Sequence, residues 1–183
     1  FILENRLQSN HYYYRKGEPK PDAISYEFSN EVQYPNYDWK ERNFRLLALF
    51  RYWNYVEYFF PYKYVMDQNW DDVLYEMIPK FNTASTQLEY HLLMRELVIK
   101  LNDSHAFLGT RVMAEKFGRK QIPARIRIVE NKALITQVYS DSLGKINDIR
   151  VGDVITKVGG KTIPEILKES RKYLDGGNDA ARI

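Results

Sequence analysis

The spacing of apolar residues changes partway along the chain, and this change is the strongest constraint on the fold. Between residues 38 and 102 the apolar residues recur every three or four positions, which is the period of an amphipathic helix. From residue 111 onward, short stretches alternate between apolar and polar residues, which is typical of strands. The sequence therefore predicts an α+β protein, with a small three-helix domain over residues 38–110 and a β-rich domain over residues 111–183.

Three helices are predicted, over residues 38–60, 70–81 and 86–101. The third carries a continuous leucine stripe on one face. Each helix is bounded by residues that commonly begin or end one: Asp38 and Pro61 for the first, Asp71 and Asp72 in the first turn of the second, and Thr86 with Glu89 as a capping box for the third.

The β-rich part is predicted to start with a hairpin. Ala124, Ile126 and Ile128 lie in an alternating stretch, residues 130–131 form a tight turn, and residues 133–139 form the return strand. A loop with one helical turn follows, then a strand over residues 154–158 and a helix from Pro164 to about residue 174. Residues 1–37 are predicted to be an arm or the end of a preceding domain, with short strands at 11–15 and 24–28.

Composition excludes several classes of site. Residues 111–183 hold fifteen Lys and Arg against nine Asp and Glu, but these cations are scattered singly without interleaved aromatic residues, so no nucleic-acid surface is predicted. No apolar run approaches the roughly 20 residues of a transmembrane helix. The chain has no cysteine, and its three histidines lack metal-ligand spacing. We therefore predict no metal and no cofactor, and we interpret His91 as a solvated or interface residue.

Residues 140–163 resemble the core of a PDZ domain, because a serine-containing loop is followed by Gly152-Asp153, a short strand and the Gly159-Gly160 turn. The resemblance implies that an extended peptide adds to a sheet edge beside the helix from Pro164. Pro123 departs from a good match because it cannot donate a ladder hydrogen bond. The implied peptide-binding residues are Ile122, Ala124, Ile126, Ile166 and Leu167.

A second motif, Leu-Asn-Asp-Ser-His-Ala-Phe-Leu at residues 101–108, comes directly after the third helix. A helical domain ending in this motif and followed by a PDZ-like domain resembles the front half of the tail-specific (C-terminal-processing) and tricorn-core family of serine peptidases, over residues 40–183. In the tricorn-like branch the resemblance implies that His105 is the catalytic base and that Ser104 shapes the site. In the processing-protease branch a lysine of the later peptidase domain is the base, and both alternatives stay open. Asp103 is interpreted as a turn residue in preference to the acid of a catalytic triad.

The resemblance implies that the nucleophilic serine lies in a peptidase domain after this chain, and that the closing strand of the PDZ-like domain lies beyond Ile183. We therefore expect the front half of a serine-type peptidase, with a peptide or unfolded protein as substrate and the downstream peptidase domain as partner. Homo-oligomers are possible partners too. An extracytoplasmic location is expected, with the cytoplasm as the alternative.

Two other functions remain open. The chain could be a non-catalytic, PDZ-like peptide-binding module. Alternatively, its tyrosine-rich first third, with eleven of the fifteen tyrosines at or before Tyr64, could bind a non-peptide ligand such as a glycan. Packing of a buried helix is the simpler explanation for these tyrosines.

Overall fold

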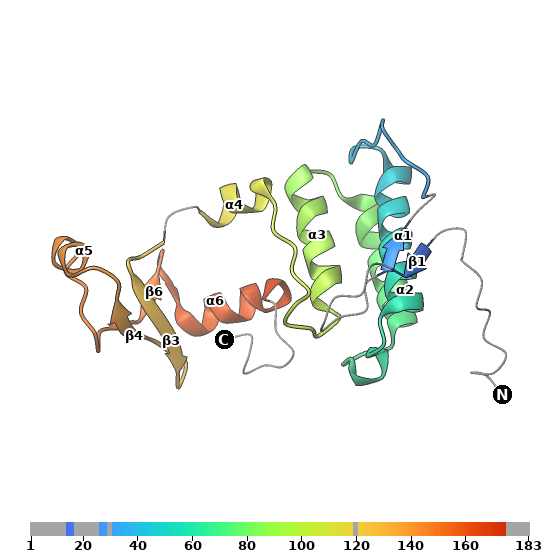
Figure 1. Ribbon diagram of the computed structural model, residues 1–183. Coiled ribbons are helices and arrows are strands. Elements are labelled where there is room, and N and C mark those ends of the chain that lie inside the picture. Colours follow the sequence, from blue (N-terminus) through green and yellow to red (C-terminus); the bar gives the residue numbers. More distant parts are fainter. Residues whose placement is uncertain (1–13, 17–25, 29–30, 119–120, 175–183) are drawn as a thin grey trace. The chain divides into compact units, whose positions relative to one another are not determined.

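The computed structural model describes residues 14–16, 26–28, 31–118 and 121–174 (Figure 1). The chain divides into two compact units, residues 1–37 and 38–183. In the first unit, β1 (Tyr14–Lys16) pairs antiparallel with β2 (Tyr26–Phe28). The two short strands predicted there, at 11–15 and 24–28, fall partly outside the described residues. The α+β class is confirmed, since helices predominate between residues 42 and 117 and a second set of antiparallel strands begins at residue 124.

The three predicted helices are confirmed as α1 (Arg42–Phe59), α2 (Trp70–Thr83) and α3 (Gln87–Ile99), with a short 3₁₀ turn η1 (Lys63–Val65) between the first two. The prediction of Asp38 as the N-cap of the first helix is wrong. Its carboxylate accepts a hydrogen bond from the Lys40 backbone N–H at 3.0 Å, which makes a turn ahead of the helix. Glu41 occupies the N-cap position instead.

The predicted capping box of α3 forms only in part. The Thr86 hydroxyl accepts the Glu89 backbone N–H at 3.1 Å, as an N-cap does. The Glu89 carboxylate, however, accepts from the backbone N–H of Ser85 at 2.8 Å and from its hydroxyl at 3.0 Å. The Thr86 and Glu89 side chains therefore both accept backbone N–H groups near the start of the helix, and α3 begins where the sequence predicts.

The helical part is held together by a core in which α1, α2 and α3 pack on one another (Figure 1). Two tryptophans lock α1 to α2: the indole N–H of Trp53 donates to the Trp70 carbonyl at 2.9 Å, and the indole N–H of Trp70 donates to the Trp53 carbonyl at 3.0 Å. The fully buried members of the core come from all three helices: Leu49, Val73, Met77, Phe81 and Leu97.

A fourth helix, α4 (Arg111–Phe117), replaces the start of the predicted β-rich region. The Thr110 hydroxyl caps it by accepting from the Met113 backbone N–H at 3.3 Å. Gly118 ends it in the left-handed region with φ of 88°, where glycine is favoured. The first strand of the β-rich part therefore begins at residue 124, as the sequence predicts, and the segment between residue 111 and that strand contains a helix that was not predicted.

The predicted hairpin is confirmed as β3 (Ala124–Val129) and β4 (Lys132–Val138), which pair antiparallel. Glu130 and Asn131 form its turn with φ of 49° and 61°, as a tight hairpin turn requires. The predicted loop with one helical turn contains α5 (Asp141–Ile146). β4 also pairs with β5 (Val154–Ile155), so the sheet has the order β3-β4-β5.

The single strand predicted over residues 154–158 is in fact two. β5 belongs to the three-stranded sheet, whereas β6 (Lys157–Val158) pairs with β7 (Lys161–Thr162) across the Gly159-Gly160 turn. The last predicted helix is confirmed as α6 (Ile163–Ser170), followed by the 3₁₀ turn η2 (Arg171–Tyr173). A complete capping box between Thr162 and Glu165 starts α6.

Candidate functional site

The turn after α3 places His105 beside a carboxylate. Its imidazole Nδ1 lies 3.4 Å from Oδ1 of Asp103, and the side chain of His105 is 95% exposed. The same Oδ1 accepts the backbone N–H of His105 at 2.8 Å. One ring nitrogen therefore faces a carboxylate, while the other has no partner among the described residues. This is the arrangement that an orienting acid gives to a histidine base.

Asp103 is confirmed as a turn residue. Its side chain closes an Asx turn onto His105, and its carbonyl accepts the Ala106 backbone N–H at 3.1 Å. The Ser104 side chain is exposed and makes no hydrogen bond within the described part of the chain. Sequence reasoning preferred a turn residue to a triad acid at Asp103, whereas the structure shows that Asp103 closes the turn and also lies beside the imidazole.

The segment after His105 is fastened to α3 by Arg95. Its guanidinium donates to the Leu108 carbonyl at 3.3 Å and lies 5.1 Å from the centre of the Phe107 ring. The same group donates to the Tyr173 carbonyl in η2 at 2.7 Å. One side chain thus connects α3, the segment that follows His105, and the end of the β-rich part. Sequence analysis did not single out Arg95.

His91 has a structural role at the far end of this segment. Its Nδ1 lies 2.8 Å from the hydroxyl of Thr110, the N-cap of α4. Burial lowers the pKa of His91 below the ordinary value for histidine. Because the Thr110 hydroxyl accepts from the Met113 N–H, it is suited to donate to a neutral imidazole. His91 is therefore a half-buried, hydrogen-bonded residue rather than a solvated one.

The residues predicted to bind peptide lie on β3, just before it, and on α6. Ile122 and Ile126 expose 39% and 40% of their surface, whereas Ala124 is buried at 8%. Ile166 and Leu167 are half-buried, and α6 packs against β4. Within the described part of the chain, β3 is an edge strand of its sheet. Accessible apolar side chains therefore lie along an open strand edge.

Pro123 lies outside the strand that it was expected to weaken. β3 begins at the next residue, so the missing N–H falls before the ladder. The carbonyl of Pro123 accepts the Tyr139 backbone N–H at 2.8 Å, which extends the pairing toward β4. The departure from the PDZ pattern therefore does not interrupt β3.

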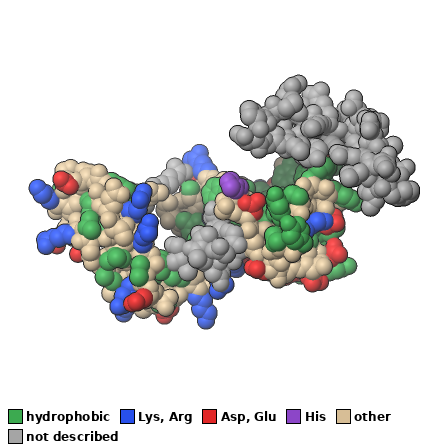
Figure 2. Space-filling view, turned by 60° about the horizontal axis from the view of Figure 1, so that its bottom comes forward, with side chains coloured by type: hydrophobic (Ala, Val, Ile, Leu, Met, Phe, Trp, Pro, Cys, Tyr) green, Lys and Arg blue, Asp and Glu red, His purple; other side chains and the backbone are tan. Residues whose placement is uncertain are grey.

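The charged side chains are distributed unevenly over the surface. On the face shown in Figure 2, Lys and Arg are spread over the β-rich part, whereas Asp and Glu and an apolar patch predominate over the helical part. In the described ranges, no three His, Asp or Glu side chains group as a metal site. No helix among those residues is long and apolar enough to cross a membrane.

No protein-family model matches the sequence, and no curated protein and no solved structure matches the chain. The class of protein therefore has to be argued from the geometry of the Asp103–His105 turn and of the β3 edge.

Proposed function

We propose that this chain is the front half of a serine-type peptidase, which supplies a histidine base and a substrate-holding domain but no nucleophile. The single observation that carries the proposal is the exposed imidazole of His105 with Asp103 at 3.4 Å from its Nδ1. A nucleophilic serine would come from a downstream peptidase domain of the same protein.

The chemistry follows from the properties of the two side chains. A serine hydroxyl is a weak nucleophile until a neighbouring imidazole accepts its proton. A carboxylate on the opposite ring nitrogen fixes the tautomer and stabilises the imidazolium that forms. Asp103 occupies that position for His105, and the exposed ring leaves room for a serine from another domain. The serine would then attack the peptide carbonyl, and the peptide C–N bond would break as the imidazolium protonates the leaving amine. Water, deprotonated by the same imidazole, would hydrolyse the acyl-enzyme ester to release the acid and restore the serine.

The β-rich part would hold the substrate. An extended peptide can add to an open strand edge through backbone hydrogen bonds, and alternate side chains then enter apolar positions. β3 offers such an edge, with Ile126 accessible on it and Ile122 accessible just before it. Ala124 of β3 and Ile166 and Leu167 of α6 complete the proposed contact. A peptide or unfolded protein is the corresponding substrate, and the extracytoplasmic location remains part of the same proposal.

The test uses the full-length protein that contains this chain. Wild type and His105→Ala are treated with a fluorophosphonate probe that labels activated serines, and labelling is followed with time. We expect His105→Ala to abolish labelling and Asp103→Asn to slow it. Arg111→Ala is the control, because Arg111 is 83% exposed and lies beyond the turn. Equal labelling of wild type and His105→Ala would contradict the assignment of the base and would favour a lysine of the downstream domain.

A non-catalytic peptide-binding module is the second candidate, and the open edge of β3 is the observation that favours it. Here the downstream region would contain no reactive serine, so neither wild type nor His105→Ala would label. Peptides with free and with amidated C-termini would then be titrated against the chain. Binding that weakens in Ile126→Asp would support the module, since this change puts a charge on the strand edge.

A further inference from the structure

One face of the edge strand β3 is apolar. Ala124, Ile126 and Ile128 share this face, because side chains two positions apart in a strand point to the same side of the sheet. The β4 partners of the two isoleucines, Ile135 and Ala133, are each only 3% exposed. This face therefore turns toward the interior of the β-rich part, and it carries the strand residues that the proposed peptide contact uses.

The opposite face of β3 carries two arginines. Arg125 and Arg127 are both exposed, and their partners on β4 are the uncharged Gln137 and Leu134. The register shift beside Arg125 leaves an extra residue, Thr136, on the β4 side of the pairing. The alternation along β3 is therefore kept, and the two guanidinium groups project from the same face of the strand.

The positive charge of these arginines is not neutralised within the sheet. Neither side chain makes an ion pair or a hydrogen bond with residues of the described ranges. The strands β3, β4 and β5 contain no Asp or Glu. Glu130 lies in the hairpin turn beyond β3, and Lys132 at the start of β4 offsets its charge. Two positive charges, those of Arg125 and Arg127, are therefore available on this face.

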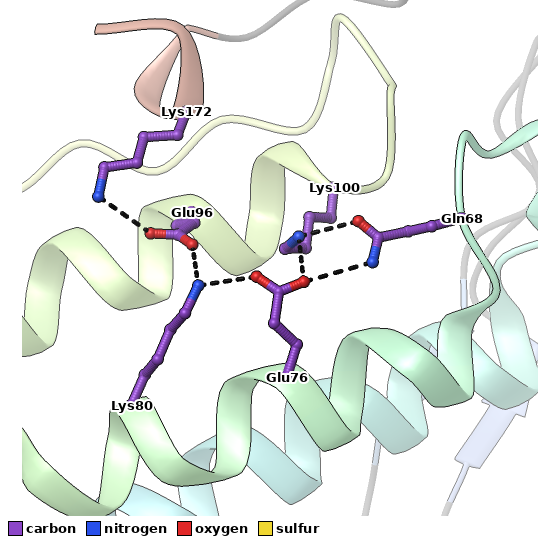
Figure 3. A network of polar contacts seen from close by, with 6 residues as sticks. All are labelled: Gln68, Glu76, Lys80, Glu96, Lys100 and Lys172. Atoms are coloured by element: carbon purple, nitrogen blue, oxygen red, sulfur yellow. Dashed lines mark hydrogen bonds and ion pairs between the residues drawn. The ribbon is translucent and has the colours of Figure 1, made fainter. Parts of the chain in front are cut away.

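Several lysines of the protein are, by contrast, already paired. In the network drawn in Figure 3, Lys80 lies 2.7 Å from Glu76 and 2.5 Å from Glu96, Lys100 lies 2.8 Å from Glu76, and Lys172 lies 3.7 Å from Glu96. These pairs connect α2, α3 and the η2 turn, so their cations serve the fold. The arginines of β3 have no comparable partner in the described part of the chain.

A peptide that adds to the open edge of β3 continues the pleat of the sheet, so its side chains alternate between the same two faces. Those on the apolar face lie beside Ala124 and Ile126, and those on the other face lie beside Arg125 and Arg127. Side chains directly opposite each other on paired strands have Cβ atoms about 5 Å apart, where opposite charges attract and like charges repel. The two faces of β3 therefore favour different side chains at alternate peptide positions.

We propose that β3 selects extended peptides with acidic side chains at two alternate positions and apolar side chains between them, and that Arg125 and Arg127 are the specificity-determining residues. The inference rests on the proposed function, because it uses the same strand edge to hold the substrate. Charge complementarity identifies the ligand: a carboxylate can accept two parallel hydrogen bonds from one guanidinium. The apolar side chains of the same peptide enter the proposed contact with Ile126, Ile166 and Leu167.

Charged residues on an edge strand can also prevent two copies of a protein from pairing edge to edge. That role depends on the presence of charge and not on its sign. Replacing both arginines with glutamates would therefore preserve the protection, whereas it would invert a preference for acidic peptides. Charge reversal thus separates the two roles.

The experiment measures the binding of three short peptides to the full chain by fluorescence anisotropy. The peptides alternate valine with glutamate, with threonine or with lysine, and each has a labelled N-terminus and a free C-terminus. We expect the glutamate peptide to bind about tenfold more tightly than the lysine peptide, because each position beside an arginine exchanges an opposite-charge pair for a like-charge pair. The uncharged threonine peptide should lie between them.

A double variant, Arg125→Glu with Arg127→Glu, tests whether β3 is the source of the preference, and it should reverse the order of the three peptides. The matched control is Lys116→Glu with Lys145→Glu, which changes the net charge by the same amount at exposed positions on α4 and α5. The control should keep the order of wild type. All four substitutions lie on exposed residues, and an unchanged circular dichroism spectrum checks that each variant folds.

The outcomes separate this inference from the proposed function. If all three peptides bind wild type equally, or if the glutamate peptide still binds most tightly to the Arg125→Glu, Arg127→Glu variant, the acidic preference is refuted while peptide binding stands. If none of the peptides binds, both the preference and the substrate-holding role of β3 are overturned. The fluorophosphonate labelling that tests His105 does not depend on either result.

Discussion

Arg45 provides the sharpest test of how the helical part is built. Its guanidinium is buried and donates to four backbone carbonyls. Two of them, Phe81 at 2.8 Å and Asn82 at 3.1 Å, belong to the last turn of α2, where carbonyls have no partner within the helix. The other two, Trp39 at 3.0 Å and Lys40 at 2.8 Å, precede α1. Arg45 therefore joins the start of one helix to the end of the next.

We expect Arg45→Met to lower the free energy of unfolding by about 2–4 kcal/mol. Leaving the buried Phe81 carbonyl without a donor costs about 1–3 kcal/mol. Loss of a cation at the C-terminal end of α2 adds roughly 0.5–1 kcal/mol. The other three carbonyls are nearer the surface and can bond to water, so they add little. The free energy of unfolding of Arg45→Lys should lie between those of Arg45→Met and wild type, because one ammonium cannot reach the carbonyls on both sides of the guanidinium.

The assay is urea unfolding followed by the helical circular dichroism signal. Arg42→Met is the matched control: Arg42 is exposed, lies one turn earlier on α1, and its replacement should change the free energy of unfolding by no more than about 0.5 kcal/mol. If the free energies of unfolding of Arg45→Met and Arg42→Met differ by less than about 0.5 kcal/mol, the claim that Arg45 holds the two helix ends together is refuted.

Three further predictions concern stability. Burial lowers the pKa of His91 in the folded state, so the stability that the neutral imidazole contributes is fully present above about pH 6.5 and is lost as the pH falls from there through the folded pKa. The free energy of unfolding in urea should therefore be lower at pH 5 than at pH 7.5, and His91→Gln should remove the share of that decrease that is due to His91. Lys80→Met should lower the free energy of unfolding by about 2 kcal/mol in the same assay, because it removes the cation paired with Glu96, whose side chain is only 9% exposed. Arg150→Met breaks the exposed pair with Asp148 and should lower it by less than about 0.5 kcal/mol. Phe81→Ala should cost about 3–5 kcal/mol in thermal or urea unfolding, since the ring has no exposed surface, and a cost below about 1 kcal/mol would contradict its place in the core.

The helices and the hairpin could be predicted because their signals are local. The Thr86 cap acts on a residue three positions away, and the Glu130-Asn131 turn needs only its own two dihedral angles. α4 was missed because its seven residues are too few for an apolar period to stand out, and the Thr110 cap was not considered. The strand over residues 154–158 was predicted as one because its division depends on which neighbour each half pairs with.

The candidate site also combines a part that depends on neighbouring residues with a part that depends on distant ones. His105 and Asp103 are two residues apart, so the turn that brings them together is set by the sequence. The contacts of Arg95, which holds the segment after this turn, are not set by nearby residues, because its guanidinium donates to the carbonyl of Tyr173, 78 positions away. A sequence pattern cannot indicate which distant carbonyl a guanidinium will meet, since that depends on how whole elements pack.

The sequence by itself determined the α+β class, the three helices with their ends to within a few residues, and the turn that carries His105, because these depend on contacts within about four positions along the chain. Only the tertiary structure decided that Arg45 closes the end of α2 and that β3 is left as an open edge in the described sheet. The physical reason is that burial and charge pairing are properties of surfaces formed by several elements, and these surfaces come into being only when the elements pack.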